Sequence, residues 1–313
     1  MLYNYSMQNV PLKNYSTSRI GGGAKYFEIA QNANDLIRFA KVAIAQNLPY
    51  FILGSGSNIL FGDHGFPGLI IKNENKGISL QGLSLQVQSG TLFNELVKFT
   101  VKNGFSGMQN MIGIPGTLGG AIVGNSGAYG QYIADHISKV VCFDPSASPF
   151  TTGIITLDKK GCQFSYRDSI FKKGKYIILN THFNFPKGKA EDLQKEMDET
   201  LAKRQENYSF TAPCPGSFFK NVLVEKVDKK FLPLIPKKII RNGKIPAGYL
   251  LEQVGACGKR IKDVQVSKHA NIFVNLGKGR TIDYLELSEM LAKKVKDGFG
   301  IELEREVQIV GNC

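Results

Sequence analysis

Two glycine-rich stretches constrain this chain more than any other feature of its sequence. The shorter one, Gly54-Ser-Gly-Ser-Asn58, directly follows the apolar run Tyr50–Leu53, which predicts a buried strand. The longer one runs from Gly113 to Gly130 and holds few large side chains. Glycine at a strand end lets backbone N–H groups approach an anion without a Cβ in the way. Two such surfaces suggest a dinucleotide cofactor, and the alternative interpretation of each is a glycine-rich surface turn.

The order of the predicted elements divides the 313 residues into four parts. Residues 1–75 alternate strands with one helix, and residues 76–208 combine half-exposed strands with helices. Residues 209–299 are rich in turns and end in a helix, and residues 300–313 contain an alternating strand over 301–310. We therefore expect two α/β subdomains, a smaller C-terminal domain and a final strand.

Sequence signals at three helix ends make sharper predictions. Asn34 is the expected N-cap of the first helix, and Thr91 is the expected N-cap of the helix that begins near Leu92. Gly298 fits the C′ position of the last helix. That helix repeats apolar residues at helical spacing, so we expect one buried face made of Tyr284, Leu287, Leu291 and Val295.

The charge balance is strongly basic. The net charge of +13 comes from 39 Lys and Arg against 26 Asp and Glu, and it suits nucleic acid, an anionic membrane or a polyanionic small molecule. The one local cluster, Lys226–Lys244, is interrupted by prolines and lacks a nucleic-acid-binding motif, so a solvated loop is expected. No apolar run approaches the roughly 18–20 residues that span a bilayer, and Met1–Asn14 does not resemble a secretory signal. A phosphorylated ligand is favoured over nucleic acid or membrane.

The cysteines point to a reducing compartment. The five are odd in number, scattered and never spaced as CxxC. This pattern argues against a disulfide framework and against a zinc site, so we expect a cytoplasmic protein without a metal.

Three polar segments are candidates for chemistry. Arg167 lies between aromatic residues and fits a carboxylate or phosphate binder, although a salt bridge with Asp168 or a distant acid is the simpler interpretation. Ser217 follows a glycine and precedes two phenylalanines; it lacks the GxSxG elbow of hydrolases and fits a turn residue. Three acidic residues alternate near the C-terminus: Glu302, Glu304 and Glu306. On one face of a strand their like charges would repel unless a ligand or cation lies between them. The simpler interpretation is that this strand face is exposed to solvent.

Several segments form an ordered set of motifs along the chain: Arg19-Ile-Gly-Gly22, Leu53–Asn58, Ile114–Gly120, Asn125–Tyr129, Tyr166–Ser169, Gly216–Asn221, Ala247–Glu252, Val266–Asn271 and Leu303–Val307. Their order resembles the UDP-N-acetylenolpyruvoylglucosamine reductases (UDP-N-acetylmuramate dehydrogenases, the MurB family) over roughly Asn14 to Gly311. The segment Val266–Asn271 is similar to the short form of the family, which lacks a tyrosine-bearing insertion.

The resemblance implies an α+β fold: a vanillyl-alcohol-oxidase/PCMH-type FAD-binding domain of two α/β subdomains, plus a smaller α+β C-terminal substrate domain. It implies a cytoplasmic enzyme of peptidoglycan precursor synthesis, expected as a monomer. The cofactor is FAD, noncovalent because neither glycine stretch holds a histidine, and NADPH is the reductant. The implied FAD contacts are Gly54, Ser55, Gly56, Ser57, Asn58, Ile114, Pro115, Gly116, Gly119, Gly120, Asn125, Gly127, Ala128 and Tyr129.

The family reaction implies three catalytic roles in the reduction of UDP-N-acetylglucosamine enolpyruvate. Ser217 would donate a proton to C2 of the enolpyruvyl group, Arg167 would bind the substrate carboxylate, and Glu306 would hydrogen-bond or polarise it. The implied substrate contacts are Tyr166, Arg204, Lys220 and Asn221. The chain departs from the family pattern at Val222, after Arg204 and in a long segment over 223–244, which bears on the nucleotide contacts.

Two other functions compete with this one. Another FAD oxidoreductase of the same fold, acting on an alcohol or a sugar, would need the glycine stretches but neither Ser217 nor Glu306. A non-enzymatic basic protein that binds RNA would use the positive charge and would be colourless after purification.

Overall fold

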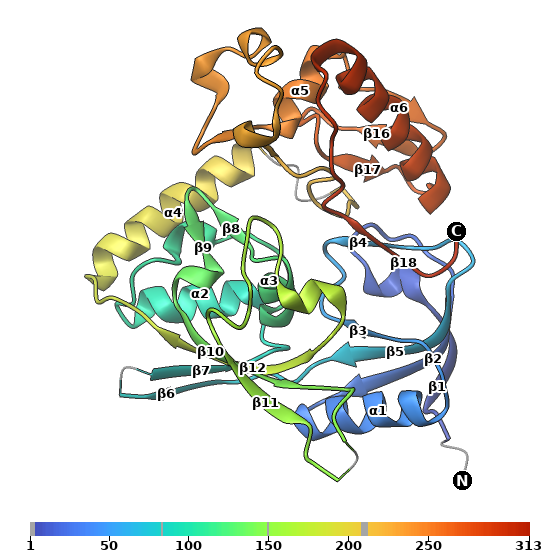
Figure 1. Cartoon of the computed structure of the whole chain (residues 1–313), viewed down its shortest axis with the longest axis vertical. Coiled ribbons are helices and arrows are strands. Elements are labelled where there is room, and N and C mark those ends of the chain that lie inside the picture. The colour runs from blue at the N-terminus through green and yellow to red at the C-terminus, as the bar shows by residue number, and fades with distance from the viewer. Residues whose placement is uncertain (1–3, 83, 149, 208–211) are drawn as a thin grey trace. The chain divides into compact units, whose positions relative to one another are not determined.

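The computed structural model describes residues 4–82, 84–148, 150–207 and 212–313 (Figure 1). The contacts between residues divide the described chain into two compact units. The first unit comprises the described parts of Met1–Val10, Lys25–Ser55 and Gly68–Glu206, and the second those of Pro11–Ala24, Gly56–Pro67 and Asn207–Cys313. The four ranges expected from the sequence stay a prediction.

The first sheet has the strand order β1-β2-β5-β3. Its strands are β1 (Met7–Pro11), β2 (Gly23–Ala30), β3 (Tyr50–Leu53) and β5 (Phe66–Asn73), and β3 runs parallel to β5. The helix α1 (Ala33–Ala45) connects β2 with β3. The prediction of Asn34 as its N-cap is wrong, because the Asn32 side chain accepts the Asp35 N–H and Asn34 already lies in the first turn.

The second sheet is antiparallel, in the order β11-β10-β12-β7-β6. Its strands are β6 (Ile78–Gln81), β7 (Ser84–Gln88), β10 (Ile137–Phe143), β11 (Ile154–Asp158) and β12 (Ile177–Asn184). Two helices, α2 (Phe93–Lys102) and α3 (Leu118–Val123), lie between β7 and β10 in the chain, and α4 (Ala190–Asn207) follows β12. The prediction of Thr91 as the N-cap of α2 is wrong. The Thr91 hydroxyl exchanges hydrogen bonds with the backbone of Gly77, and Leu92 takes the cap position.

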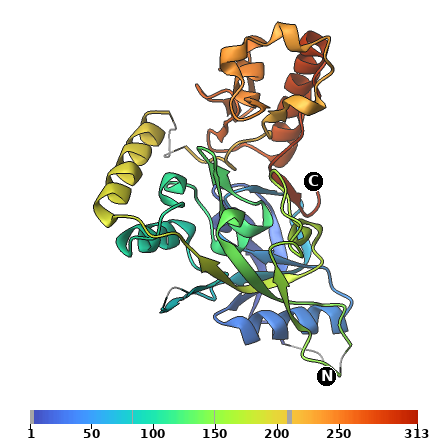
Figure 2. The same ribbon diagram turned by 60° about the vertical axis from the view of Figure 1, so that its left-hand side comes forward.

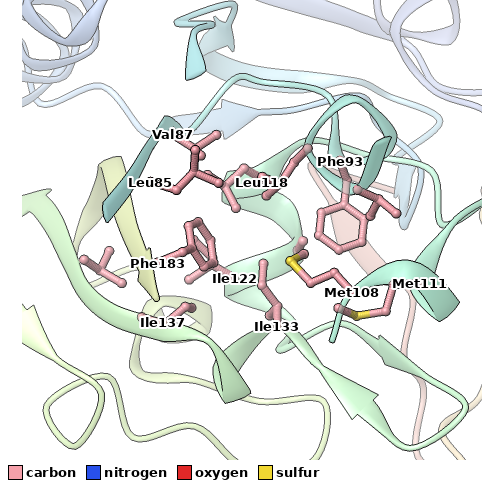
Figure 3. Packing of buried hydrophobic residues seen from close by; sticks show 14 of the residues in the cluster. Leu85, Val87, Phe93, Met108, Met111, Leu118, Ile122, Ile133, Ile137 and Phe183 are labelled. Atoms are coloured by element: carbon pink, nitrogen blue, oxygen red, sulfur yellow. The ribbon is translucent and has the colours of Figure 1, made fainter. Parts of the chain in front are cut away.

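Side chains of β12 contribute to two cores on opposite faces of this sheet. Ile177 and Leu179 pack with buried residues of α1, and Ile178 and Phe183 pack with those of α2 and α3. An irregularity in the pairing of β12 with β10 falls between Ile178 and Asn180. Figures 1 and 2 agree in placing α1 on one face of the sheet and α2 and α3 on the other. Figure 3 shows the second of these cores, in which labelled side chains from β7, α2, α3 and β12 interdigitate. The second sheet is therefore packed against a hydrophobic core on each of its two faces.

The second unit contains α5 (Ala247–Gln253), α6 (Thr281–Phe299) and several short strands. The predicted buried face of α6 is confirmed, since Tyr284, Leu287, Leu291 and Val295 are fully buried. The prediction for Gly298 is wrong: the helix continues to Phe299, and Gly300 adopts the left-handed conformation that ends it (φ 62°). The strands are β13 (Val222–Leu223) with β14 (Lys244–Ile245), β15 (Arg260–Ile261) with β16 (Val264–Val266) and β17 (Phe273–Asn275), and β18 (Gln308–Val310) parallel to β4 (Ile59–Phe61).

The strand predicted over 301–310 is shorter than expected. Regular strand structure is confined to β18, and before it Arg305 makes an isolated bridge with Phe219. The remaining regular elements of the described chain are the two-stranded pair β8 (Gly127–Ala128) and β9 (Gln131–Tyr132) and the 3-10 helices Leu12–Tyr15, Gln109–Met111, Ile133–Asp135, Ile170–Lys173, Val224–Lys226, Leu232–Leu234 and Lys237–Ile239.

Three further observations concern the whole described chain. All five cysteines are free thiols. Within residues 4–82, 84–148, 150–207 and 212–313, no three His, Cys, Asp or Glu side chains gather as metal ligands would. In the same ranges no helix combines the length and the apolar content that crossing a bilayer requires.

Candidate functional site

The two glycine-rich stretches meet within the first unit at Gly54 and Thr117. Gly54 directly follows β3, and a Cβ on it would lie 2.5 Å from the Thr117 Oγ1. That hydroxyl caps α3 by accepting the Gly120 N–H at 3.4 Å. From the neighbouring strand β5, the Lys72 Nζ donates to the Gly54 carbonyl at 2.6 Å, and burial lowers the pKa of this ammonium. Only glycine permits this close approach between the end of β3 and the start of α3.

The second glycine stretch is tied along its length to the segment that precedes α2. Phe93 donates its N–H to the Gly116 carbonyl at 3.0 Å, and Gly119 donates to the Ser89 carbonyl at 2.8 Å. Gly116 has a φ of 131°, a conformation that glycine adopts without strain. By contrast, Gly120 is exposed, and the nearest atom to a Cβ placed on it is the Thr117 Oγ1 at 3.7 Å. The stretch therefore presents an anchored backbone surface with an open side.

The segment Asn125–Tyr129 forms a fixed hairpin in the same unit. The Asn125 amide donates to the Ser165 carbonyl at 2.8 Å, and both Asn125 and Tyr129 have positive φ, 41° and 52°. A Cβ on Gly127 would lie 2.4 Å from the Gln131 carbonyl oxygen, so the turn tolerates no larger residue there. The Tyr129 side chain is 58% exposed. The backbone is held in place while the tyrosine remains accessible.

Arg167 lies beside this hairpin. Its Nη2 donates to the Gly127 carbonyl at 3.1 Å, and its guanidinium carbon is 5.7 Å from the centre of the Tyr166 ring. Arg167 itself has a φ of 54°, an uncommon conformation for a residue with a side chain. Arg204, from α4, donates to the Gly113 carbonyl at 3.4 Å. The first unit thus brings Tyr166, Arg167 and the Asn125–Tyr129 hairpin together, and places Arg204 at the start of the longer glycine stretch.

The second unit brings Ser217 and Glu306 onto adjacent backbone segments. Ser217 bridges with Ile272, and the next residue, Phe218, accepts the Glu306 N–H at 2.9 Å. Phe218 is fully buried among the aromatic side chains of the core, whereas Ser217 and Glu306 are half-buried. The buried Phe218 therefore anchors the backbone that carries Ser217 and that is hydrogen-bonded to Glu306.

The second half of the shorter glycine stretch, Gly56–Asn58, lies against both of these residues in the second unit. The Asn58 amide donates to the Glu306 carbonyl at 3.2 Å, and the Asn58 carbonyl accepts the Gln308 N–H at 3.1 Å. Gly216 has a φ of 85°, and a Cβ on it would lie 3.4 Å from the Ser57 carbonyl oxygen. A predicted cofactor turn, the predicted proton donor and the predicted carboxyl group are thus neighbours within one unit.

The other predicted substrate residues of this unit have partners in the protein. The Lys220 Nζ forms a 2.5 Å ion pair with Glu304, and its backbone N–H donates to the Glu304 carbonyl at 2.9 Å. The Asn221 Oδ1 accepts the Ala247 N–H at the start of α5, at 3.1 Å. Glu304 and Glu306 therefore have different surroundings, although sequence alternation treats them alike.

The structure groups two of the three predicted catalytic residues in one unit, the second, and the third, Arg167, in the first. The predicted FAD contacts are likewise divided, with Gly54, Ser55 and all those from Ile114 to Tyr129 in the first unit. Convergence of all three catalytic groups on one substrate stays a prediction. Sequence reasoning did not single out Lys72, Thr117 or Asn271, each of which holds a predicted site segment in place. Thr117 and Asn271 lie inside quoted motifs, whereas no pattern marked Lys72.

Comparisons with known proteins show which family the chain resembles. One family model, described as an FAD binding domain, matches residues 24–153, and another, described as UDP-N-acetylenolpyruvoylglucosamine reductase, C-terminal domain, matches residues 207–310. The chain is 33% identical over 305 residues to the UDP-N-acetylenolpyruvoylglucosamine reductase of Solibacter usitatus, covering 97% of this chain and 96% of the relative. It is 32% identical to that of Clostridium novyi, covering 97% and 91%.

A solved structure supports the same assignment. The crystal structure of UDP-N-acetylenolpyruvylglucosamine reductase from Thermus caldophilus superposes with a TM-score of 0.73 at 28% identity, covering 97% of this chain and 98% of that one. The predicted α+β fold, with an FAD-binding domain followed by a separate C-terminal domain, is confirmed. On its similarity to these relatives over nearly its whole length, the chain belongs to the UDP-N-acetylenolpyruvoylglucosamine reductase family.

Proposed function

We propose that this protein reduces UDP-N-acetylglucosamine enolpyruvate to UDP-N-acetylmuramate, with noncovalent FAD as cofactor and NADPH as reductant. The relatives are named for this reduction. The single observation that carries the proposal is the arrangement of the second unit, where Phe218, next to Ser217, is hydrogen-bonded to Glu306 and Gly216 lies against the Gly56–Asn58 turn. Family membership does not favour an oxidase of alcohols or sugars.

The residues of the first unit fit a large planar cofactor with a diphosphate. The backbone at Gly116, Gly119 and Gly120 is anchored on one side and open at Gly120, so a flat or phosphorylated group can contact it without meeting a side chain. Thr117 of the longer stretch lies against Gly54 of the shorter one, and Lys72 holds the Gly54 carbonyl. Bound FAD would supply hydride transfer, from NADPH to C3 of the enolpyruvyl group.

Ser217 would donate the proton that C2 requires after hydride addition at C3. A serine hydroxyl is a weak acid at neutral pH, and it becomes effective against a strongly basic carbanion such as the one that develops at C2. Proton donation by a positioned side chain is typically worth about 10²–10⁴ in rate. The nearby Glu306 would hydrogen-bond the substrate carboxylate, which makes the developing enolate less costly.

Arg167 would bind the same carboxylate through its guanidinium. Its Nη2 is fixed by the Gly127 carbonyl, and its uncommon backbone conformation restricts where the side chain can extend. Tyr166, Arg204, Lys220 and Asn221 would contact the remainder of the nucleotide-sugar. The positive net charge of the chain favours a substrate that carries a diphosphate.

The test is the visible spectrum of the purified protein, followed by NADPH oxidation with and without UDP-N-acetylglucosamine enolpyruvate. We expect a yellow protein whose NADPH oxidation depends on the enolpyruvyl substrate. A colourless protein that cannot be loaded with FAD would refute the proposal. So would a rate of NADPH oxidation that is the same with and without the enolpyruvyl substrate.

A further inference from the structure

We infer that Asn271 is a positioning residue that holds Ser217 where it delivers its proton, an inference that rests on the proposed function. Asn271 is 3% exposed and lies in the second unit, on the loop that precedes β17. It is 52 residues away in sequence from the phenylalanine that it contacts, Phe219. It does not touch the substrate in this scheme, and it acts through the backbone of the Gly216–Phe219 segment.

Three hydrogen bonds connect Asn271 with that segment. Its backbone carbonyl accepts the Phe218 N–H at 2.8 Å, and its Oδ1 accepts the Phe219 N–H at 2.9 Å. Its Nδ2 donates to the Phe219 carbonyl at 2.8 Å. Both peptide N–H groups that follow Ser217, and the carbonyl of Phe219, are therefore satisfied by one residue.

The Asn271 side chain takes the place of a neighbouring strand. A carboxamide carries one acceptor and one donor group in a plane, and so matches the N–H and C=O of a single residue as a strand partner does. The main chain cannot supply this pairing, because it turns here: the Ile272 N–H bonds to the His269 carbonyl at 2.8 Å. The side chain therefore extends the pairing by one residue beyond the Ser217–Ile272 bridge.

The opposite edge of the segment is held by the backbone of residues 304–306. The Phe218 carbonyl accepts the Glu306 N–H at 2.9 Å, and the Lys220 N–H donates to the Glu304 carbonyl at 2.9 Å. Asn271 and Glu306 thus form hydrogen bonds with opposite edges of the Phe218–Phe219 backbone, directly beside Ser217. Loss of the Asn271 side-chain bonds releases this edge at Phe219, while the bond from the Phe218 N–H to the Asn271 carbonyl remains. We expect Ser217 to shift relative to Glu306 as a result. Misplacement of a reacting group by about 1 Å can cost about 10² in rate.

The decisive variant is Asn271→Asp, which keeps the size and the acceptor but, when ionised, lacks the donor and sets a charged oxygen against the Phe219 carbonyl. We expect substrate reduction by pre-reduced holoenzyme to slow about 10- to 100-fold, with flavin reduction by NADPH within about twofold of wild type. The deficit should narrow as the pH falls, because the protonated carboxyl regains a donor. Amide exchange in the peptide containing Phe218 and Phe219 should be faster than in wild type.

The matched control is Asn275→Asp. Asn275 is another buried asparagine of the second unit, 4% exposed, whose side chain donates to the Ser18 carbonyl at 3.0 Å and accepts the Gly277 and Gly279 N–H groups. The same exchange of amide for carboxylate there should lower stability without slowing substrate reduction selectively. If Asn271→Asp does not fold, Asn271→Ser removes the same side-chain bonds and keeps the backbone bond.

Equal slowing of both half-reactions by the Asn271 variant, or equal slowing of substrate reduction by the Asn271 and Asn275 variants, would overturn the inference. Unchanged amide exchange in the Phe218–Phe219 peptide would also overturn it. Failure of the proposed function would appear separately, in wild-type holoenzyme that does not reduce the enolpyruvyl substrate at all.

Discussion

Gly54→Ala should damage the proposed cofactor site because of one steric contact. The added methyl would lie 2.5 Å from the Thr117 Oγ1, whereas non-bonded carbon atoms reach optimal contact at about 3.5–4.0 Å. No unfavourable backbone conformation contributes, since Gly54 is not among the residues with positive φ. To make room, Thr117 must move away from the end of β3, and its hydroxyl must leave the Gly120 N–H that it caps.

The magnitude follows from these two changes. Overpacking costs about 1–3 kcal/mol and loss of a threonine N-cap about 1 kcal/mol. We therefore expect the free energy of unfolding to fall by about 2–4 kcal/mol. If at least about 1.4 kcal/mol of this separates the two glycine stretches that we propose hold FAD, the Kd for FAD rises tenfold or more.

The assay is a fluorescence titration of FAD-free protein with FAD, together with urea unfolding of the same protein. Gly298→Ala is the matched control: Gly298 is exposed within α6, and a Cβ there meets no atom within 4 Å. Alanine favours a helix over glycine by up to about 1 kcal/mol, so this variant should be slightly more stable and should bind FAD as wild type does. If Gly54→Ala retains wild-type FAD affinity and urea resistance, the close contact between the two stretches is not as described.

Three more outcomes are expected. Ser217→Ala should slow substrate reduction at least about a hundredfold while flavin reduction by NADPH stays nearly unchanged; equal loss of both in stopped-flow absorbance would reject the proton-donor role. The Asp63 carboxylate accepts two backbone N–H groups at the start of α6, at 2.9 and 3.1 Å. Asp63→Ala should therefore lower the free energy of unfolding, measured by urea titration, by about 2–4 kcal/mol. A decrease below about 1 kcal/mol would contradict this capping role. Burial raises the pKa of the Cys142 and Cys162 thiols to about 12, so at pH 8 both stay protonated and a disulfide reagent should label the exposed Cys257 much faster; rapid labelling of the buried pair would contradict their placement.

Local patterns predicted elements better than their ends. The buried face of α6 follows from helical spacing alone, and the structure confirms it. The predicted end of that helix, Gly298, is two residues too early, because it is Gly300 that adopts the left-handed conformation. At the start of α1 the cap lies at Asn32, two residues before the predicted Asn34. The Asn32 Oδ1 accepts the Asp35 N–H, and the Asp35 carboxylate accepts the Gln31 N–H. These two residues, Asn32 and Asp35, are three positions apart, which is the spacing of reciprocal capping pairs.

Only those parts of the candidate site that lie in recognisable sequence motifs were predictable. Composition and spacing marked the glycine stretches, and resemblance to a family gave Arg167, Ser217 and Glu306 their expected roles. Neither could show that Asn271 pairs with Phe219, because the contact joins residues 52 positions apart and uses a side chain in place of a strand. Alternation also failed to separate Glu304 from Glu306, since the difference lies in the ion pair with Lys220.

The most direct test of the proposed function is a single turnover without oxygen. Holoenzyme is first reduced by NADPH, separated from the nucleotide and then mixed with UDP-N-acetylglucosamine enolpyruvate, while the visible absorbance of oxidised flavin is followed and the product is identified by mass. We predict that the flavin is reoxidised and that an equivalent amount of UDP-N-acetylmuramate forms. Flavin that stays reduced in the presence of this substrate, or that is reoxidised without forming this product, would contradict the account.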